Sequence, residues 1–140
     1  MKIGKRTGIA VSAMALLLGV AGGTAQAAQT TTTGTTGTLA CSTSSATTPR
    51  TATVDTIHIE LRYSTSSRCA WGRITNADPG DQVWVDRSSN GGSSWSGPLG
   101  LTTVQYGTDT YTPAYSDAGY VMRACAWNDT TGHIKCTGWY

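Results

Sequence analysis

From residue 28 onward the sequence lacks any stretch of about eleven residues with helical periodicity, which argues against a helical or α/β domain. It offers instead short runs rich in β-branched and aromatic residues, separated by Gly, Pro, Asn and Asp at intervals of roughly eight to twelve residues. This pattern is typical of compact all-β domains. We therefore predict a small antiparallel β-sandwich or barrel.

The sequence also lacks an apolar run of the roughly 20 residues that a membrane-spanning helix needs. The apolar run 9–20 is shorter, follows three basic residues and precedes Ala25-Gln26-Ala27, which fits an A-x-A cleavage site. We expect residues 1–27 to be a signal peptide. The mature protein is then secreted, extracellular and not held in a membrane.

An excess of basic residues is absent once this leader is set aside. Three of the ten Lys and Arg residues lie within it, so seven remain against eight Asp and Glu. A surface that binds nucleic acid needs clustered positive charge, which this balance does not provide. Nucleic acid is excluded as a partner.

The four cysteines contain no C-x-x-C pair, so a zinc site is disfavoured and we expect no metal and no cofactor. Small secreted domains are commonly stabilised by disulfides, and four cysteines allow three pairings. Cys125 and Cys136 flank the turn signal 128–132, which favours a bridge between adjacent strands and leaves Cys41 for Cys69. The other pairings stay open.

Residues 28–53 form a low-complexity arm rich in Thr, with no charge before Arg50. Such a segment buries too little surface to order itself, so it is either a flexible or O-glycosylated linker or an extended strand that adds to a partner. For the second case, the candidate contacts are Thr31, Thr33, Thr35 and Leu39. The globular domain is expected to span 54–140.

The clearest periodic signal lies in residues 57–74. Three apolar residues alternate with three polar ones: Ile57, Ile59 and Leu61 with His58, Glu60 and Arg62. This period of two predicts a strand with one buried face, and the run 69–74 after a polar bend predicts its partner.

Further strands are predicted downstream. Residues 82–87 place Val83 and Val85 on one face and Trp84 on the other. Residues 99–106 and 110–115 are predicted to pair as a hairpin around Gly107, and 120–127 forms another apolar run.

Residues 88–95 fit the pattern S-x-[DN]-x-G-x-[ST]-W of the Asp-box, a hairpin turn that is repeated in sialidase propellers. It occurs once here. Since its Ser and Asn side chains can bond the turn backbone, we interpret it as a structural clip and not as a sign of glycosidase activity.

Aromatic side chains are numerous, with five Trp and six Tyr, more than one small core can bury. We expect exposed, partner-binding aromatics at Trp84, Trp95, Trp139 and Tyr140. A flat platform of them would suit a polysaccharide, and a row along an edge strand would suit a protein chain. A third option is an inhibitor of secreted hydrolases that uses the loop 88–100.

Catalysis is not expected. His58 and Glu60 share one strand face and His133 could join them, but such pairs are common on solvated faces. No serine lies in a G-x-S-x-G elbow, and the cysteines are expected to be oxidised.

Several motifs resemble the YjfA-like family of small secreted domains of Gram-positive bacteria: Glu60-Leu61-Arg62-Tyr63-Ser64, Trp71-Gly72-Arg73, Pro79-Gly80-Asp81 and Arg123-Ala124-Cys125. The resemblance covers roughly residues 54–140 and implies no catalytic residues.

The layout of leader, Thr-rich arm and disulfide-bonded β domain is also similar to that of the small adaptor subunits of streptomycete umbrella toxin particles. In those subunits an extended N-terminal segment docks into a lectin-bearing subunit and the globular part holds the stalk protein. This similarity implies an adaptor that joins other secreted proteins.

Overall fold

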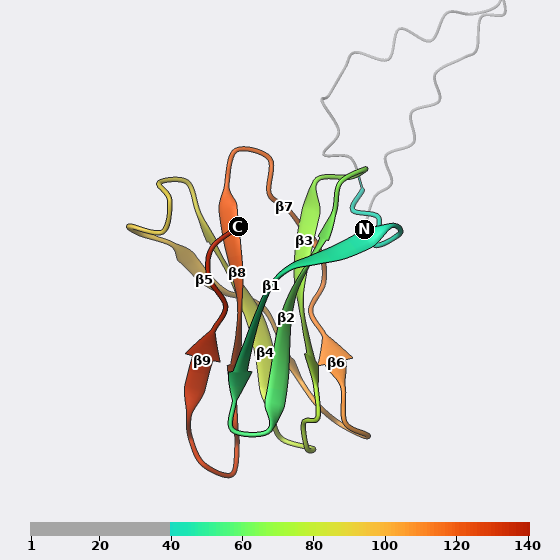
Figure 1. The fold of residues 1–140 in the computed structure, drawn as a ribbon, viewed down its shortest axis with the longest axis vertical. Helices are drawn as coiled ribbons and strands as arrows, with labels where there is room; N and C mark the ends of the chain where they lie inside the picture. The colour runs from blue at the N-terminus through green and yellow to red at the C-terminus, as the bar shows by residue number, and fades with distance from the viewer. Residues whose placement is uncertain (1–39) are drawn as a thin grey trace, which may run out of the picture. The chain divides into compact units, whose positions relative to one another are not determined.

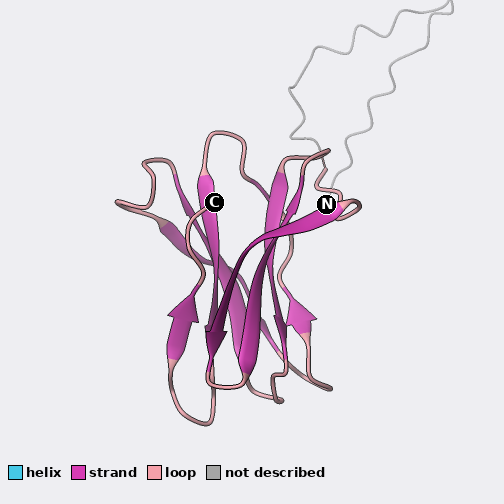
Figure 2. Cartoon of the chain, viewed as in Figure 1, coloured by secondary structure: helices cyan, strands magenta, loops and turns pink. Residues whose placement is uncertain are grey.

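The structure is a computed structural model that describes residues 40–140. Every regular element in this range is a β-strand, and all strand pairs are antiparallel (Figure 2). The predicted all-β class is therefore confirmed. The described part of the chain contains no helix that is long and apolar enough to cross a membrane.

The strands form two sheets that pack as a sandwich (Figure 1). One sheet has the order β1-β2-β3-β6, with β7 also paired to β3; its strands are β1 (Ala46–Val54), β2 (Ile57–Ser64), β3 (Cys69–Thr75), β6 (Thr110–Tyr111) and β7 (Tyr115–Ser116). The other sheet has the order β5-β4-β8-β9; its strands are β4 (Gln82–Ser88), β5 (Ser96–Thr103), β8 (Val121–Trp127) and β9 (Ile134–Cys136).

The core lies between the two sheets. As the alternation predicts, Ile57, Ile59 and Leu61 of β2 are fully buried, and they share one apolar cluster with Val83 and Val85 of β4. Burial of side chains of this size stabilises the fold by about 1.5 to 3 kcal/mol each.

Gly72 in β3 lies close against the facing sheet. A Cβ atom there would lie 3.0 Å from Cγ2 of Val83 and 3.3 Å from Cβ of Ala124 in the facing sheet. A larger residue at this position would force the facing side chains to shift, so the spacing of the sheets favours glycine here, whereas its backbone conformation does not.

Both favoured disulfides are present. Cys41 bonds Cys69 at the start of β3, and Cys125 bonds Cys136, its direct cross-strand partner between β8 and β9. The first ties the beginning of the described chain to the sandwich. Two disulfides are compatible with an extracellular or other oxidising compartment.

The predicted boundary at residue 54 is too late in the chain. Strand β1 already begins at Ala46 and pairs with β2 along most of its length, so residues 46–53 belong to the sandwich and not to the arm. Its Thr-rich, half-exposed pattern suits an edge strand, which needs few apolar residues. The predicted signal peptide and the arm contacts Thr31, Thr33, Thr35 and Leu39 lie outside the described residues.

The hairpin predicted for 99–106 and 110–115 is not formed. β5 pairs with β4, whereas β6 pairs with β3 in the other sheet, so the chain crosses between sheets after β5. Val104 anchors the crossing, because it is 1% exposed and its N–H donates to the carbonyl of Asp81 at 2.8 Å. The apolar residue that suggested a strand is thus buried in a connection.

Candidate binding site

The candidate site lies on the outer face of the β5-β4-β8-β9 sheet. Since Val83 and Val85 point into the core, the intervening residues of β4 point outward. Three cross-strand pairs between β4 and β8 therefore form the floor of the site: Gln82 with Trp127, Trp84 with Cys125, and Asp86 with Arg123.

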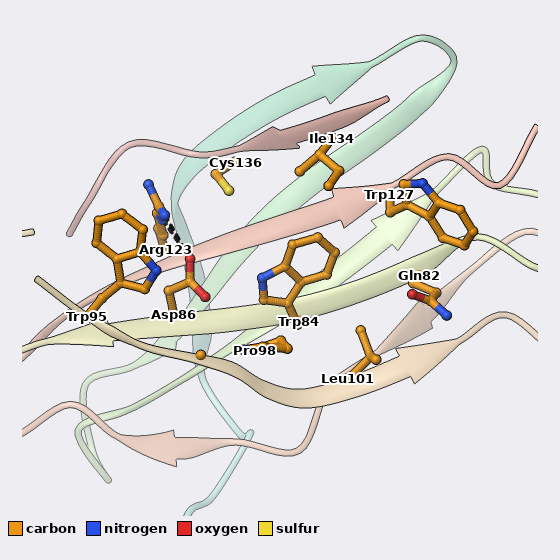
Figure 3. A pocket seen from close by; sticks show the side chains of 11 residues that line it. Gln82, Trp84, Asp86, Trp95, Pro98, Leu101, Arg123, Trp127, Ile134 and Cys136 are labelled. Atoms are coloured by element: carbon orange, nitrogen blue, oxygen red, sulfur yellow. Dashed lines mark hydrogen bonds and ion pairs between the residues drawn. The ribbon is translucent and has the colours of Figure 1, made fainter. Parts of the chain in front are cut away.

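These side chains line an open pocket of about 660 Å³ (Figure 3). Its size falls in the range of about 300 to 1,000 Å³ that is usual for ligand sites. The lining residues come from all four strands of the sheet and from the segments beside them: Gln82, Trp84, Asp86, Trp95, Gly97, Pro98, Leu101, Arg123, Trp127, Ile134 and Cys136.

An ion pair occupies one end of the pocket. Nε of Arg123 donates a hydrogen bond to Oδ2 of Asp86 at 2.9 Å, and Nη2 lies at the same distance from that oxygen. Asp86 is only 4% exposed although it belongs to the outward-facing set, because Arg123 covers it and Gly97 lies against its Oδ1 atom. A side chain at Gly97 would collide with this carboxylate.

Two indole rings meet the guanidinium of Arg123. Its Cζ atom lies 4.5 Å from the ring centroid of Trp95 and 4.6 Å from that of Trp139, and the two centroids are 6.2 Å apart. Cation–π contacts of this kind are favourable by about 0.5 to 2 kcal/mol. They hold Trp95 in place although it is 52% exposed.

The Asp-box hairpin positions Trp95 at the rim. Ser88 Oγ accepts hydrogen bonds from the N–H groups of Asn90 and Gly92 at 3.2 and 2.8 Å, and Asn90 Oδ1 accepts one from Ser94 N–H at 2.9 Å. Gly92 has a φ of +94°, and a Cβ atom there would collide with the indole of Trp139, so a larger residue is disfavoured on both counts. The interpretation as a structural clip is confirmed.

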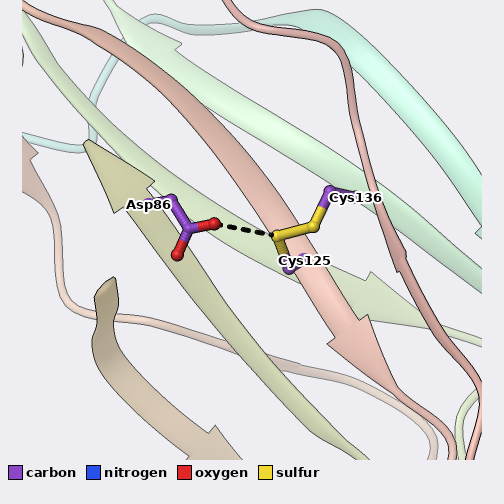
Figure 4. A group of neighbouring side chains, drawn as sticks. All are labelled: Asp86, Cys125 and Cys136. Carbon is purple, nitrogen blue, oxygen red and sulfur yellow. Dashed lines mark hydrogen bonds between the residues drawn. A yellow bond between two sulfur atoms is a disulfide. The ribbon is translucent and has the colours of Figure 1, made fainter. Parts of the chain in front are cut away.

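The second disulfide lies directly beneath the pocket. Ligand atoms of Asp86, Cys125 and Cys136 lie within 4.8 Å of one another, a spacing that could hold a metal ion (Figure 4). The two sulfur atoms are bonded to each other, however, and so cannot act as thiolate ligands. All four cysteines are used in disulfides, which rules out the four-cysteine zinc alternative.

The structure brings together only part of the predicted aromatic set. Trp84 and Trp95 line the pocket and Trp139 lies beside Trp95. Tyr140 lies elsewhere, with its ring centroid 5.3 Å from that of Tyr63.

Sequence reasoning missed Trp127, Asp86 and Arg123. Part of the signal was available, because Arg123 and Trp127 alternate with the small apolar residues Ala124 and Ala126. The pairing of Arg123 with Asp86 depends on the register of β4 against β8.

The predicted polar cluster lies on the other sheet. Glu60 is 3.8 Å from His58, 3.5 Å from Arg62 and 3.4 Å from Arg73, which makes a charged ladder on a partly exposed face. His133 is not part of it; its Nδ1 contacts Oδ1 of Asp55 at 3.1 Å.

Asp55 links two turns at one end of the sandwich. Its carboxylate accepts a hydrogen bond from the hydroxyl of Thr131 at 2.7 Å in the β8–β9 turn. This hydrogen bond, followed by that of His133, lowers the pKa of Asp55 below its usual range.

Comparison with known proteins gave one match. No curated protein and no solved structure matches the chain. Residues 23–125 match a protein family described as DUF2690, proteins of unknown function. The match leaves the resemblance to the YjfA-like family and to toxin adaptor subunits as predictions. Since the matched region is well over half of the 140 residues, the chain belongs to the DUF2690 family.

Proposed function

We propose that the protein is a secreted, non-enzymatic binding module that acts as an adaptor between other secreted molecules. The observation that carries this proposal is the gathering of four of the five tryptophans on one sheet face. Three of them line the open pocket: Trp84, Trp95 and Trp127. Trp and Arg at the centre of a desolvated patch are the residues that most often dominate binding energy.

The charged groups of the pocket support binding over catalysis. Asp86 and Arg123 are joined by a hydrogen bond and an ion pair, and Arg123 also contacts two indoles. Groups held by so many structural contacts serve to fix the shape of a surface. A general base, in contrast, needs to be free to take a proton from a substrate.

Secretion is supported by the two disulfides together with the expected signal peptide 1–27. Disulfides persist in oxidising compartments, and the domain is small enough to benefit from them. The partners in this proposal are accordingly other secreted proteins and, for the pocket, an extracellular ligand.

The adaptor role assigns a second contact to the Thr-rich arm. The bond between Cys41 and Cys69 and the pairing of β1 from Ala46 fix the base of this arm to the sandwich. Residues 28–39 are uncharged and rich in Thr, a composition suited to strand addition on a partner, through Thr31, Thr33, Thr35 and Leu39. The resemblance to toxin adaptor subunits agrees with this role.

The test compares three secreted forms of the protein in native culture fluid. One is unchanged, one carries a Gly/Ser sequence of equal length in place of residues 28–38, and one carries Trp84→Ala with Trp127→Ala. Co-purifying proteins are quantified by mass spectrometry, with Tyr111→Ala on β6 as the exposed aromatic control.

We expect the Gly/Ser form to lose one protein partner while its thermal unfolding is unchanged, because a flexible sequence of equal length preserves reach but not strand addition. Retention of every partner would make the arm a linker. The adaptor proposal fails if neither the arm nor the pocket variant changes what the protein binds.

A polysaccharide is the second candidate partner. It is favoured by the position of Trp84 and Trp127 on the face of the sheet, across its two central strands, and not along an edge. Such a face can stack on a ring but cannot extend the sheet.

A further inference from the structure

We infer that the tryptophan pocket, defined by the lining residues given above, binds a neutral sugar ring of an oligosaccharide or polysaccharide. This inference deepens the proposed binding role and rests on it. The adaptor would then join a protein, held by the arm, to a glycan, held by the sandwich.

Charge is the first argument. Asp86 and Arg123 are the charged residues of the pocket lining, and their 2.9 Å ion pair cancels one charge with the other. The cation of Arg123 is further covered by Trp95 and Trp139. A pocket without net charge complements an uncharged ligand and gives no electrostatic gain to a phosphate or a carboxylate.

The mixture of surfaces is the second argument. A sugar ring has an apolar C–H face and a rim of hydroxyl groups. The pocket offers indoles at Trp84 and Trp127 for the face and polar groups at Gln82 and Asp86 for the rim (Figure 3). Indoles with a few polar groups between them fix both the position and the orientation of such a ligand.

The polar groups retain bonding capacity. Nε of Arg123 donates to Oδ2 of Asp86, and no described residue donates to its Oδ1, although Gly97 lies against that atom and little of Asp86 is exposed. Gln82 uses its amide nitrogen in one long 3.4 Å contact to Thr103. The Gln82 amide is thus the polar group of the pocket that is most available to sugar hydroxyls.

The shape of the pocket is fixed before binding. Trp95 is held by Arg123 and by the Asp-box hairpin, and the Asp86 carboxylate is held against Gly97. A preformed site avoids the cost of about 0.5 to 1.5 kcal/mol per side chain that ordering on binding would bring. This matters for weak ligands such as sugars, because their small binding free energy would be reduced further by the ordering of side chains.

A polypeptide fits the same place less well. An extended peptide gains affinity by pairing with a free strand edge, but the pocket lies over β4 and β8, whose edges are already paired. The flanking edges are also poor templates. β5 has two register irregularities and contains Pro98, which lacks an N–H, and β9 has only three residues.

The test uses soluble hexasaccharides of glucose, N-acetylglucosamine, xylose and mannose, with hexagalacturonate as the charged control. Each is titrated into the disulfide-bonded protein by calorimetry and by tryptophan fluorescence, up to millimolar concentration. We expect at least one neutral hexasaccharide to bind, and hexagalacturonate to bind at least about tenfold more weakly than it.

Variants then locate the site. Trp127→Ala should weaken binding by about tenfold or more, Trp127→Phe by less, and Tyr111→Ala not at all. Thermal unfolding and far-UV circular dichroism check that each variant is folded. If Trp127→Ala is unstable, Trp127→Phe still tests the site, because phenylalanine preserves an aromatic face but a smaller one.

The inference is overturned if no neutral hexasaccharide binds, if hexagalacturonate binds best, or if Trp127→Ala leaves binding unchanged. Failure here is distinguishable from failure of the adaptor proposal. If sugars do not bind but Trp84→Ala with Trp127→Ala still removes a co-purified protein, the pocket is a protein site and the binding-module proposal stands. If the pocket variants alter neither sugar binding nor the co-purified proteins, the pocket is not a binding site, and the adaptor proposal then fails as well if the Gly/Ser form also retains every partner.

Discussion

The ion pair beneath the tryptophans gives the sharpest prediction about stability. Asp86→Asn keeps the shape of the side chain and removes its charge, while Arg123 keeps its contacts to Trp95 and Trp139. The substitution therefore isolates the charge of one partner. It also tests whether the rigid end of the pocket depends on this pair.

The magnitude follows from the geometry. Two unit charges at 2.9 Å attract by about 6 kcal/mol at an effective dielectric constant near 20. Desolvation of a carboxylate that is 4% exposed offsets much of this attraction. Removing one charge from a fully buried pair costs about 3 to 5 kcal/mol, and since the Arg123 side chain is 21% exposed we expect about 2 to 3 kcal/mol.

The assay is equilibrium unfolding in urea, followed by tryptophan fluorescence with the disulfides intact. A double-mutant cycle with Arg123→Met supplies the control, because the double variant leaves no charge unpaired. We expect a coupling free energy of about 1 to 3 kcal/mol, nearly unchanged between low and moderate salt. A loss below about 0.5 kcal/mol for Asp86→Asn, or an additive cycle, would refute this reasoning.

Three further predictions follow from other parts of the fold. Replacing Cys41 and Cys69 by Ala should lower the free energy of unfolding by about 3 to 4 kcal/mol, as expected for a bond that spans 28 residues; a loss below about 1 kcal/mol in urea unfolding would contradict it. The pKa of Asp55 is lower in the folded state than in the unfolded state, so the ionised carboxylate stabilises the fold above a pH of about 4, and this stabilisation is lost as the pH falls through the folded pKa. Asp55→Asn should therefore make the free energy of unfolding less dependent on pH in the acid range. Acid unfolding curves that are the same for the variant and the unchanged protein would argue against this role of Asp55. His58→Ala and Glu60→Ala should each cost under about 1 kcal/mol and leave any ligand binding intact, whereas loss of a measured turnover in either folded variant would reopen the question of catalysis.

The sequence allowed those elements to be predicted whose signal is local. The alternation of Ile57, Ile59 and Leu61 assigned β2 and its buried face, because one side of a strand must meet the core. The pairing of Cys125 with Cys136 could be favoured because a turn signal separates two short strands. The Asp-box hydrogen bonds were likewise encoded within eight residues.

The features that depend on distant pairing could not be predicted. Residues around Val104 had a strand-like composition, but their burial is decided by a crossing between sheets that only the assembled sandwich defines. Similarly, Asp86 belonged to an outward-facing set and yet is buried, because Arg123 from β8 covers it. The register of β4 against β8 places Asp86 opposite Arg123 and Gln82 opposite Trp127 in the floor of the pocket. Such a register is set by the whole sheet and not by either strand alone.

The most direct test of the account follows the indole N–H signals of the five tryptophans by nuclear magnetic resonance. The protein is titrated with the neutral hexasaccharides, and single Trp→Phe variants assign the signals. If the tryptophan pocket binds the sugar, the signals of Trp84 and Trp127 shift in a saturable manner, while that of Trp71, which is buried in β3, does not. The claim that the tryptophan pocket is the ligand-binding surface would be contradicted if the signals of Trp84 and Trp127 did not shift. It would also be contradicted if the signal of Trp71 shifted as much as those two signals.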